Sequence, residues 1–301
     1  PGWNWQQYLP GDRSELIWRD YHPTSVLPQV TNPQSGFVHS ANQTPFNISE
    51  ARDNPLPTLA PKNGGWQTRM TNRATRGLEL FEEFGEISFD EAWQLKHDNR
   101  YSINYRGMAF LKEVTALPPS SEAVASAIDI LSSWDRGTDK ANRGAALGVC
   151  VLAAEWQAES GGTSTPDANE ILNECIEQTL AIGGRLDPAW GDVNRHGRDG
   201  KRWPVAGRPD TLRAIYSRRL ERDDHLTAVA GDGLYYFIRW TPDGEQRVLG
   251  THQYGNDMTN PDSPHYLDQA EDYTNEILHE PRFTEESRQG HVSKRYTVSS
   301  N

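Results

Sequence analysis

The sequence predicts an α+β chain in which a large helical region precedes antiparallel strands. Apolar residues recur at helical spacing through much of residues 68–187, whereas shorter apolar runs separated by Gly, Pro and Asp follow residue 188. The chain has 301 residues, 35% of them hydrophobic, so it can bury a substantial core in one large domain or two ordinary ones. We divide it into an extended segment with a strand and loop over residues 1–67, the helical region, and a strand-rich region over 188–301 that ends in a helix and a tail.

The first of these regions has little regular pattern. Prolines interrupt residues 1–31, so we expect an extended segment anchored by its aromatic side chains. Pro33 and Gly36 then mark a turn, and residues 37–40 are predicted to form a short strand. Asn42 follows at the point where that strand must stop. A side-chain amide at a strand end is well placed for a functional role, but asparagine is also a common residue of ordinary turns.

The helical region carries several start signals and two cysteines. Ser88 lies three residues before Glu91, which is the spacing of a capping box. Cys150 and Cys175 both fall on helix faces with a buried pattern, where each is either a free apolar thiol or half of a single disulfide. Apolar periodicity predicts helices over residues 70–85, 101–117, 121–134, 141–159 and 167–182.

The strand-rich region contains three apolar runs separated by turn residues. Residues 226–230 and 234–240, joined by the Gly-Asp-Gly of residues 231–233, predict a β-hairpin. The Thr-Pro-Asp-Gly turn at 241–244 leads to a third antiparallel strand over 248–254. A short helix is expected near the end of the chain.

Charge and hydropathy exclude some partners. The formal charge of −12, from 42 acidic and 30 basic residues, argues against a nucleic-acid partner. The densest basic cluster, residues 213–222, is interleaved with acids and is interpreted as a solvated face. No apolar run approaches the roughly 18 residues that span a bilayer, so we expect no membrane partner. The chain opens at Pro1 without a signal-peptide pattern, from which we expect a processed or truncated piece of a longer protein.

Four stretches resemble one enzyme family in the same order. The first resembles the segment of the β-subunit of penicillin acylase family enzymes that carries the oxyanion-hole asparagine, and the matching part of acyl-homoserine-lactone acylases. Together the four stretches resemble the C-terminal part of a β-subunit over nearly the whole chain. They read Asn32-Pro33-x-x-Gly36-Phe37-Val38-x-x-x-Asn42-x-x-Pro45, Asn72-Arg73 in a helix, Trp190-Gly191-Asp192-Val193-Asn194-Arg195, and Ser263-Pro264-His265-Tyr266-x-Asp268-Gln269.

This resemblance implies a fold and site residues. The implied fold is part of the αββα four-layer sandwich of N-terminal nucleophile (Ntn) hydrolases, with antiparallel strands and a large helical layer. Asn42 would donate to the negative oxygen of the tetrahedral intermediate, and Arg73 would hold the Asn42 carbonyl so that its NH₂ faces the substrate. His196 follows the third matching stretch and would line the acyl pocket, although a loop histidine is also commonly polar surface.

The same resemblance implies that this chain needs other polypeptide segments for catalysis. In the family, the β-subunit begins with a Ser that attacks the amide and whose α-amino group serves as base. Pro1 has no nucleophilic side chain, so we expect the nucleophile on another segment and this chain alone to be inactive. The implied partners are the remaining part of the β-subunit with its N-terminal Ser, and an α-subunit.

The implied substrate is a small-molecule acyl amide of β-lactam, N-acyl homoserine lactone or lipopeptide type, which would link the enzyme to antibiotics or to quorum quenching. The implied location is the periplasm or the exterior. The resemblance implies no cofactor, with any structural Ca²⁺ bound mostly outside this chain.

Two other classes of function remain open. A non-catalytic binding or scaffold protein derived from the same fold would suit the missing nucleophile, and it should fold alone. A fragment of a β-subunit should instead show a large apolar face with unpaired strand edges. A helical carbohydrate-active enzyme would use paired carboxylates across one cleft, for which Glu82 with Glu83 and Glu155 with Glu159 are candidates on helix faces expected to be exposed.

Two weaker motifs have ordinary structural explanations. Ser263, His265 and Asp268 are neighbours on a loop and helix start, where a catalytic triad rarely converges, so packing and capping roles are favoured. The oxygen-rich residues 256–262 lack the spacing of a known Ca²⁺ loop, which favours a solvated turn. The sequence contains no Gly-rich phosphate loop, metal-binding Cys/His spacing or Gly-x-Ser-x-Gly motif.

Overall fold

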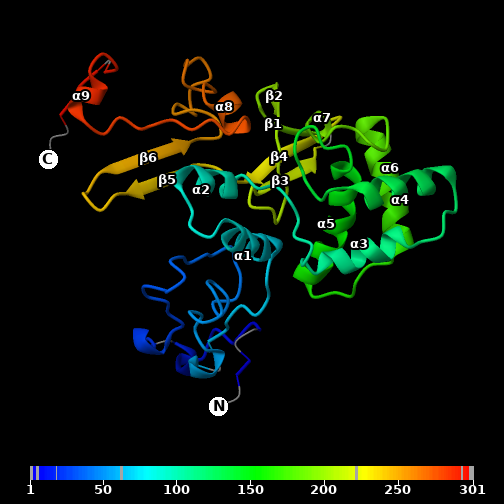
Figure 1. Cartoon of the computed structure of the whole chain (residues 1–301), viewed down its shortest axis with the longest axis horizontal. Coiled ribbons are helices and arrows are strands. Elements are labelled where there is room, and N and C mark those ends of the chain that lie inside the picture. Colours follow the sequence, from blue (N-terminus) through cyan, green and yellow to red (C-terminus); the bar gives the residue numbers. More distant parts are fainter. Residues whose placement is uncertain are drawn as a thin grey trace. The chain divides into compact units, whose positions relative to one another are not determined.

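The computed structural model describes residues 3–4, 7–17, 19–61, 64–220, 223–292 and 294–297. Pro1, from which we expect the nucleophile on another segment, lies outside the described residues. The chain divides into two compact units, one comprising Pro1–Ile87 with Tyr101–Met108 and the other Ser88–Arg100 with Ala109–Asn301. Figure 1 shows helices and strands in separate stretches of the chain, so the α+β prediction is confirmed.

The first unit is mostly irregular and contains one long helix, α1 (Asn72–Phe84), as expected over 70–85. Short 3₁₀ turns precede it at Ser14–Leu16, Thr24–Val26 and Pro57–Leu59. The short strand predicted over residues 37–40 does not form. Its backbone groups have other partners instead: the Ser49 hydroxyl donates to Phe37 O at 2.8 Å, the Gln43 amide donates to His39 O at 3.1 Å, and His39 N donates to Ile48 O at 2.7 Å.

Side-chain bonds to the backbone also shorten the helix expected over residues 101–117. Ser102 N donates to the Asn72 side chain at 2.8 Å, and Asn104 N donates to the Ser102 hydroxyl at 2.9 Å. Such bonds compete with a helical ladder, and α3 begins only at Gly107.

The helices of the second unit follow the predicted periodicity closely. The capping box predicted at Ser88 and Glu91 is confirmed. α5 continues to Gly161, and the left-handed Gly162 ends it. The bounds are α2 (Phe89–Lys96), α3 (Gly107–Thr115), α4 (Glu122–Ser133), α5 (Ala145–Gly161), α6 (Ala168–Gly183), α7 (Trp190–Val193), α8 (Ala270–Thr274) and α9 (Glu285–Arg288).

A helical core lies among α3, α4, α5 and α6 (Figure 1). Leu147 and Val151 of α5 are fully buried in it, beside Leu172 of α6. A disulfide joins Cys150 of α5 to Cys175 of α6, which settles the choice that the sequence left open. Among the described residues, no helix is both long and apolar enough to cross a membrane.

Six strands form two small sheets in the described part of the chain. The first sheet has the order β2-β1-β4-β3, in which β1 and β4 are parallel and the other neighbours are antiparallel. The second sheet is the antiparallel pair of β5 and β6. The bounds are β1 (Asn194–Arg198), β2 (Lys201–Pro204), β3 (Ile215–Arg219), β4 (Leu226–Gly231), β5 (Tyr235–Trp240) and β6 (Gln246–Thr251).

The hairpin predicted from residues 226–240 is wrong. β4 pairs with β1 and β3, while β5 pairs with β6 across the turn at 241–244. The Gly-Asp-Gly link cannot form a tight hairpin because Asp232 N donates to Ala214 O at 2.7 Å and the Asp232 carboxylate is held by Lys96. The third antiparallel strand expected over 248–254 is observed as β6, shifted toward the turn.

Candidate active site

Asn42 lies in a short backbone segment that the residues on either side hold in place. Its φ of 59° is in the left-handed region, which asparagine tolerates better than most residues. Asn42 is exposed, whereas Ala41 and Gln43 are buried. The Gln43 amide donates to His39 O at 3.1 Å and to Asn47 O at 3.0 Å, and these bonds close the loop around Asn42.

Arg73, in the first turn of α1, reaches the Asn42 side chain. Its Nη2 donates to Asn42 Oδ1 at 3.0 Å. Because the carbonyl oxygen accepts this bond, Asn42 Nδ2 is directed away from Arg73 with its two N–H donors. Among the described residues, none accepts a hydrogen bond from Nδ2, so these donors are available to a ligand.

The start of α1 is tied to the same loop by two further residues. The Thr71 hydroxyl donates to Ala41 O at 2.9 Å and accepts from Ala74 N at 3.1 Å as the N-cap of α1. His39 Nε2 donates to Arg73 O at 3.3 Å. Burial lowers the pKa of His39, against the opposing effect of this bond, so the ring is neutral near pH 7.

His196 lies in a different setting, inside an aromatic cluster on β1. It is 4% exposed, and its Nε2 donates to Gln253 O at 2.6 Å. The ring stacks on Tyr254 at 4.8 Å between centroids and lies 5.0 Å from Tyr273. Burial lowers the pKa of His196 to about 4, so the ring is neutral at physiological pH. A role in an acyl pocket stays a prediction.

The other sequence candidates have ordinary partners. The Ser263 hydroxyl accepts from His265 N at 3.2 Å, and His265 Nδ1 contacts Asp268 Oδ2 at 2.8 Å, so the serine bonds a backbone amide instead of the imidazole. Asn260 Oδ1 accepts from Asp262 N at 3.2 Å in a turn. Within the described ranges, no group of three or more His, Cys, Asp or Glu residues is placed to hold a metal ion.

The carboxylate pairs also differ from expectation in one place. Glu82 and Glu83 are exposed, as predicted, but Glu155 is buried at 7% exposure. The reason is its position on the side of α5 that carries Leu147 and Val151, because it follows Val151 by four residues and Leu147 by eight.

Sequence reasoning missed a buried charge network in the second unit. Arg213, expected on a solvated face, is 0% exposed, and its Nη1 lies 3.1 Å from Asp232 Oδ2. Lys96 Nζ donates to the same oxygen at 2.6 Å, and Glu276 lies 3.8 Å from Arg213 Nε. Burial lowers the pKa of Lys96 and raises the pKa of Glu276. The only sign of this network in the sequence is Asp232, an acidic residue between two glycines, and that pattern also fits a turn.

An exposed amide whose carbonyl is held by a cation has the chemistry that amide-cleaving enzymes use to stabilise an oxyanion. Comparison with known proteins agrees with this class. The sequence profile of the family described as penicillin amidase matches residues 2–290, and the chain belongs to this family of amidohydrolases.

The structure is also similar to a solved one, thermostable penicillin G acylase from Alcaligenes faecalis. The match has a TM-score of 0.45 and 11% sequence identity. It covers 90% of this chain and 58% of that chain, so the present chain spans somewhat more than half the length of that acylase chain.

Proposed function

We propose that this chain is part of an acylase that hydrolyses the amide bond between an acyl side chain and an amine nucleus. In this proposal, Asn42 Nδ2 donates to the oxyanion of the tetrahedral intermediate and Arg73 keeps the amide in that orientation. The observation that carries the proposal is the hydrogen bond from Arg73 Nη2 to Asn42 Oδ1 at 3.0 Å. Catalysis of this kind needs donors that are aimed before the charge develops, and it uses no cofactor.

The proposed nucleophile is an N-terminal Ser on another segment of the β-subunit, and the proposed complete fold is the αββα sandwich with an α-subunit. One face of β5 supports a missing layer. Alternate residues there are large, apolar and exposed, with Tyr236 at 51%, Ile238 at 44% and Trp240 at 67%, and Leu234, just before the strand, is exposed at 56%. Within the described residues β5 pairs only with β6, so its other edge is also open to a neighbouring strand.

The proposed substrate is a small acyl amide whose amine nucleus is a β-lactam, a homoserine lactone or a lipopeptide. The proposed location is the periplasm or the exterior of the cell. The disulfide between Cys150 and Cys175 supports that location, because disulfides persist mainly in oxidising compartments.

The substitution Asn42→Asp tests the proposed donor with little change of shape. Aspartate keeps an oxygen for Arg73 and tolerates the left-handed backbone, but it cannot donate from the position of Nδ2. In the complete protein, with every segment present, we expect kcat for a chromogenic acyl amide to fall about 10²–10³-fold. The melting temperature should stay close to that of the unmodified protein.

Asn32→Asp is the matched control, because Asn32 also has a left-handed backbone, with φ 49°, in the same segment. It should leave kcat unchanged. An Asn42→Asp enzyme with full activity would overturn the oxyanion role. A complete protein that contains the N-terminal Ser segment and cleaves no acyl amide would favour the scaffold alternative.

A further inference from the structure

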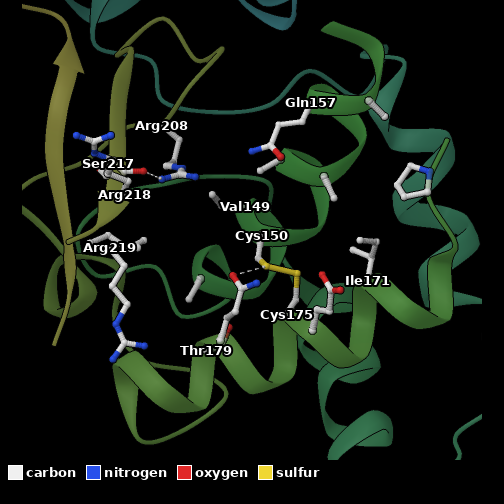
Figure 2. A pocket seen from close by; sticks show the side chains of 18 of the residues that line it. Val149, Cys150, Gln157, Ile171, Cys175, Thr179, Arg208, Ser217, Arg218 and Arg219 are labelled. Atoms are coloured by element: carbon white, nitrogen blue, oxygen red, sulfur yellow. Dashed lines mark hydrogen bonds between the residues drawn. A yellow bond between two sulfur atoms is a disulfide. The ribbon is translucent and has the colours of Figure 1, made fainter. Parts of the chain in front are cut away.

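A cavity in the second unit has no part in the proposed reaction. It measures about 640 Å³ and lies among α5, α6, β3 and the loop that follows β2 (Figure 2). Its volume is within the roughly 300–1,000 Å³ of typical small-molecule sites. Neither Asn42 nor Arg73 lines it.

Small side chains of α5 create the space. Ala146, Val149, Ala153 and Ala154 recur at helical spacing and line the cavity, whereas Leu147 on the other side of α5 packs in the helical core. The helix is therefore apolar on two sides, and on the cavity side Ala146 and Val149 are buried while Ala153 and Ala154 are half-buried. A second wall comes from α6, which lies next to α5, and the disulfide between Cys150 and Cys175 joins these two walls (Figure 2).

The polar side of the cavity is basic. Figure 2 shows Arg208, Arg218 and Arg219, here called the basic rim, on the side opposite α5. Among the described residues that line it, Glu174 is the only acidic one. Three arginines against one glutamate give a local excess of positive charge, in a chain whose formal charge is −12. Such a site concentrates anions.

The rim is partly fixed in position. Arg208 is buried, its Nη1 donates to Ser217 O at 3.2 Å, and its guanidinium lies 5.6 Å from the Trp190 ring centre. Arg218 and Arg219 are exposed at the end of β3, and no carboxylate of the described residues forms an ion pair with either. In Figure 2 the three guanidinium groups point in different directions, so together they give this side of the cavity a positive potential and do not form one clamp. The buried, oriented Arg208 is the group best fixed to meet a small anionic group at the edge of the apolar space.

We propose that this cavity binds an organic carboxylate with an apolar body, such as a medium-chain alkyl carboxylate. The alkyl chain would lie against the small residues of α5, and the carboxylate would face the basic rim. Burial of the chain supplies most of the binding free energy, because each buried methylene contributes about 0.8 kcal/mol on transfer from water. The rim then selects the anion over a neutral molecule of the same shape.

Photocrosslinking with peptide mapping tests the proposal in the complete protein. The probe is a medium-chain alkyl carboxylate that carries a diazirine in its chain. We expect labelled peptides from α5 and α6. Octanoate should compete with the probe, whereas octanamide, which lacks the charge, and inorganic phosphate, which lacks the apolar body, should not.

Variants separate the two parts of the proposed site. The double variant Arg218→Gln with Arg219→Gln should weaken competition by octanoate about tenfold. Ala153→Leu should reduce labelling of α5 and α6, because its three added carbon atoms occupy part of the space against α5 where the alkyl chain would lie. The matched controls are Arg239→Gln with Arg247→Gln, two exposed arginines paired across β5 and β6, and Ala181→Leu on an exposed position of α6. Both controls should label normally.

Three results would overturn the proposal. The first is labelling that avoids both α5 and α6. The second is competition by octanamide equal to that by octanoate. The third is labelling that Ala153→Leu leaves intact, since the probe would then bind elsewhere.

Discussion

Arg73 hydrogen-bonds an exposed, neutral amide, whereas Arg213 is fully buried beside the carboxylate of Asp232. Arg213 also donates to Tyr273 O at 2.9 Å, and its guanidinium lies 4.4 Å from the Tyr273 ring centre. Both arginines orient a neighbour, but only Arg213 has lost its hydration.

Because the two arginines differ in burial, their substitution should change different properties of the protein. A buried ion pair whose partner is removed leaves an uncompensated charge in a poorly polarisable interior, and the folded state is destabilised strongly. A cation at the surface retains solvent on one side and can be replaced with little change in stability. Substitutions around Arg213 should therefore change the free energy of unfolding, and substitutions of Arg73 should change the rate of the proposed reaction.

The largest effect is expected from Asp232→Ala. Asp232 accepts from both Lys96 and Arg213, at 2.6 and 3.1 Å, so its removal leaves the fully buried Arg213 and the half-buried Lys96 beside each other. We expect a loss of about 3–5 kcal/mol in the free energy of unfolding, measured by urea denaturation. Asp243→Ala, in the exposed turn before β6, is the control and should change stability by less than about 0.5 kcal/mol. Equal effects of the two substitutions would show that the network is not a buried charge cluster.

Arg213 also shows where prediction from sequence stops. Its partners Asp232 and Tyr273 lie 19 and 60 residues away along the chain, so no local pattern reveals them. Helix α2 was predictable because Ser88 and Glu91 form its capping box within four residues. Strand β1 was not, because its sequence, Asn-Arg-His-Gly-Arg, has no apolar alternation.

The candidate active site was only partly predictable from the sequence. Asn42 and Arg73 are separated by 31 residues, and only the resemblance to acylases linked them before the structure was known. The segment before Asn42 was expected to be a strand, but Ser49, Gln43 and the backbone of Ile48 bond its backbone groups, and irregular bonds of this kind leave no periodic signal in the sequence.

A smaller effect on stability is expected from pH at His196. Its ordinary pKa of 6.5 falls to about 4 in the folded chain because the ring is buried. Between pH 6.5 and about pH 4 the unfolded chain binds more protons than the folded chain, so a fall in pH favours unfolding. The stability that the neutral ring contributes is present above pH 6.5 and is lost as the pH falls toward 4. From pH 7 to pH 5 we expect a loss of about 2 kcal/mol from this group.

His196→Gln isolates that contribution. The variant should be less stable than the parent at pH 7, but its stability should fall less steeply as the pH is lowered to 5. His265→Gln is the control, because His265 is exposed and pairs with Asp268 at the surface. If His196→Gln kept the full pH dependence of the parent, the ring would not be held neutral by burial.

The smallest expected effect concerns Arg73 and falls on activity alone. Arg73→Lys keeps the charge but replaces a planar fork with a compact ammonium on a flexible stem, so the Asn42 carbonyl is oriented less tightly. We expect kcat of the complete enzyme to fall about tenfold, which corresponds to about 1.4 kcal/mol in activation free energy. The free energy of unfolding should change by less than about 0.5 kcal/mol.

Arg76→Lys is the matched control, since Arg76 lies one turn further along α1 and pairs with Glu79 at 3.6 Å. It should leave both kcat and stability unchanged. Because Asn42→Asp removes the donor itself, its effect on kcat should exceed that of Arg73→Lys, and the double variant should be little slower than Asn42→Asp alone. Independent, additive effects of the two substitutions would mean that Arg73 acts on the substrate directly and not through Asn42.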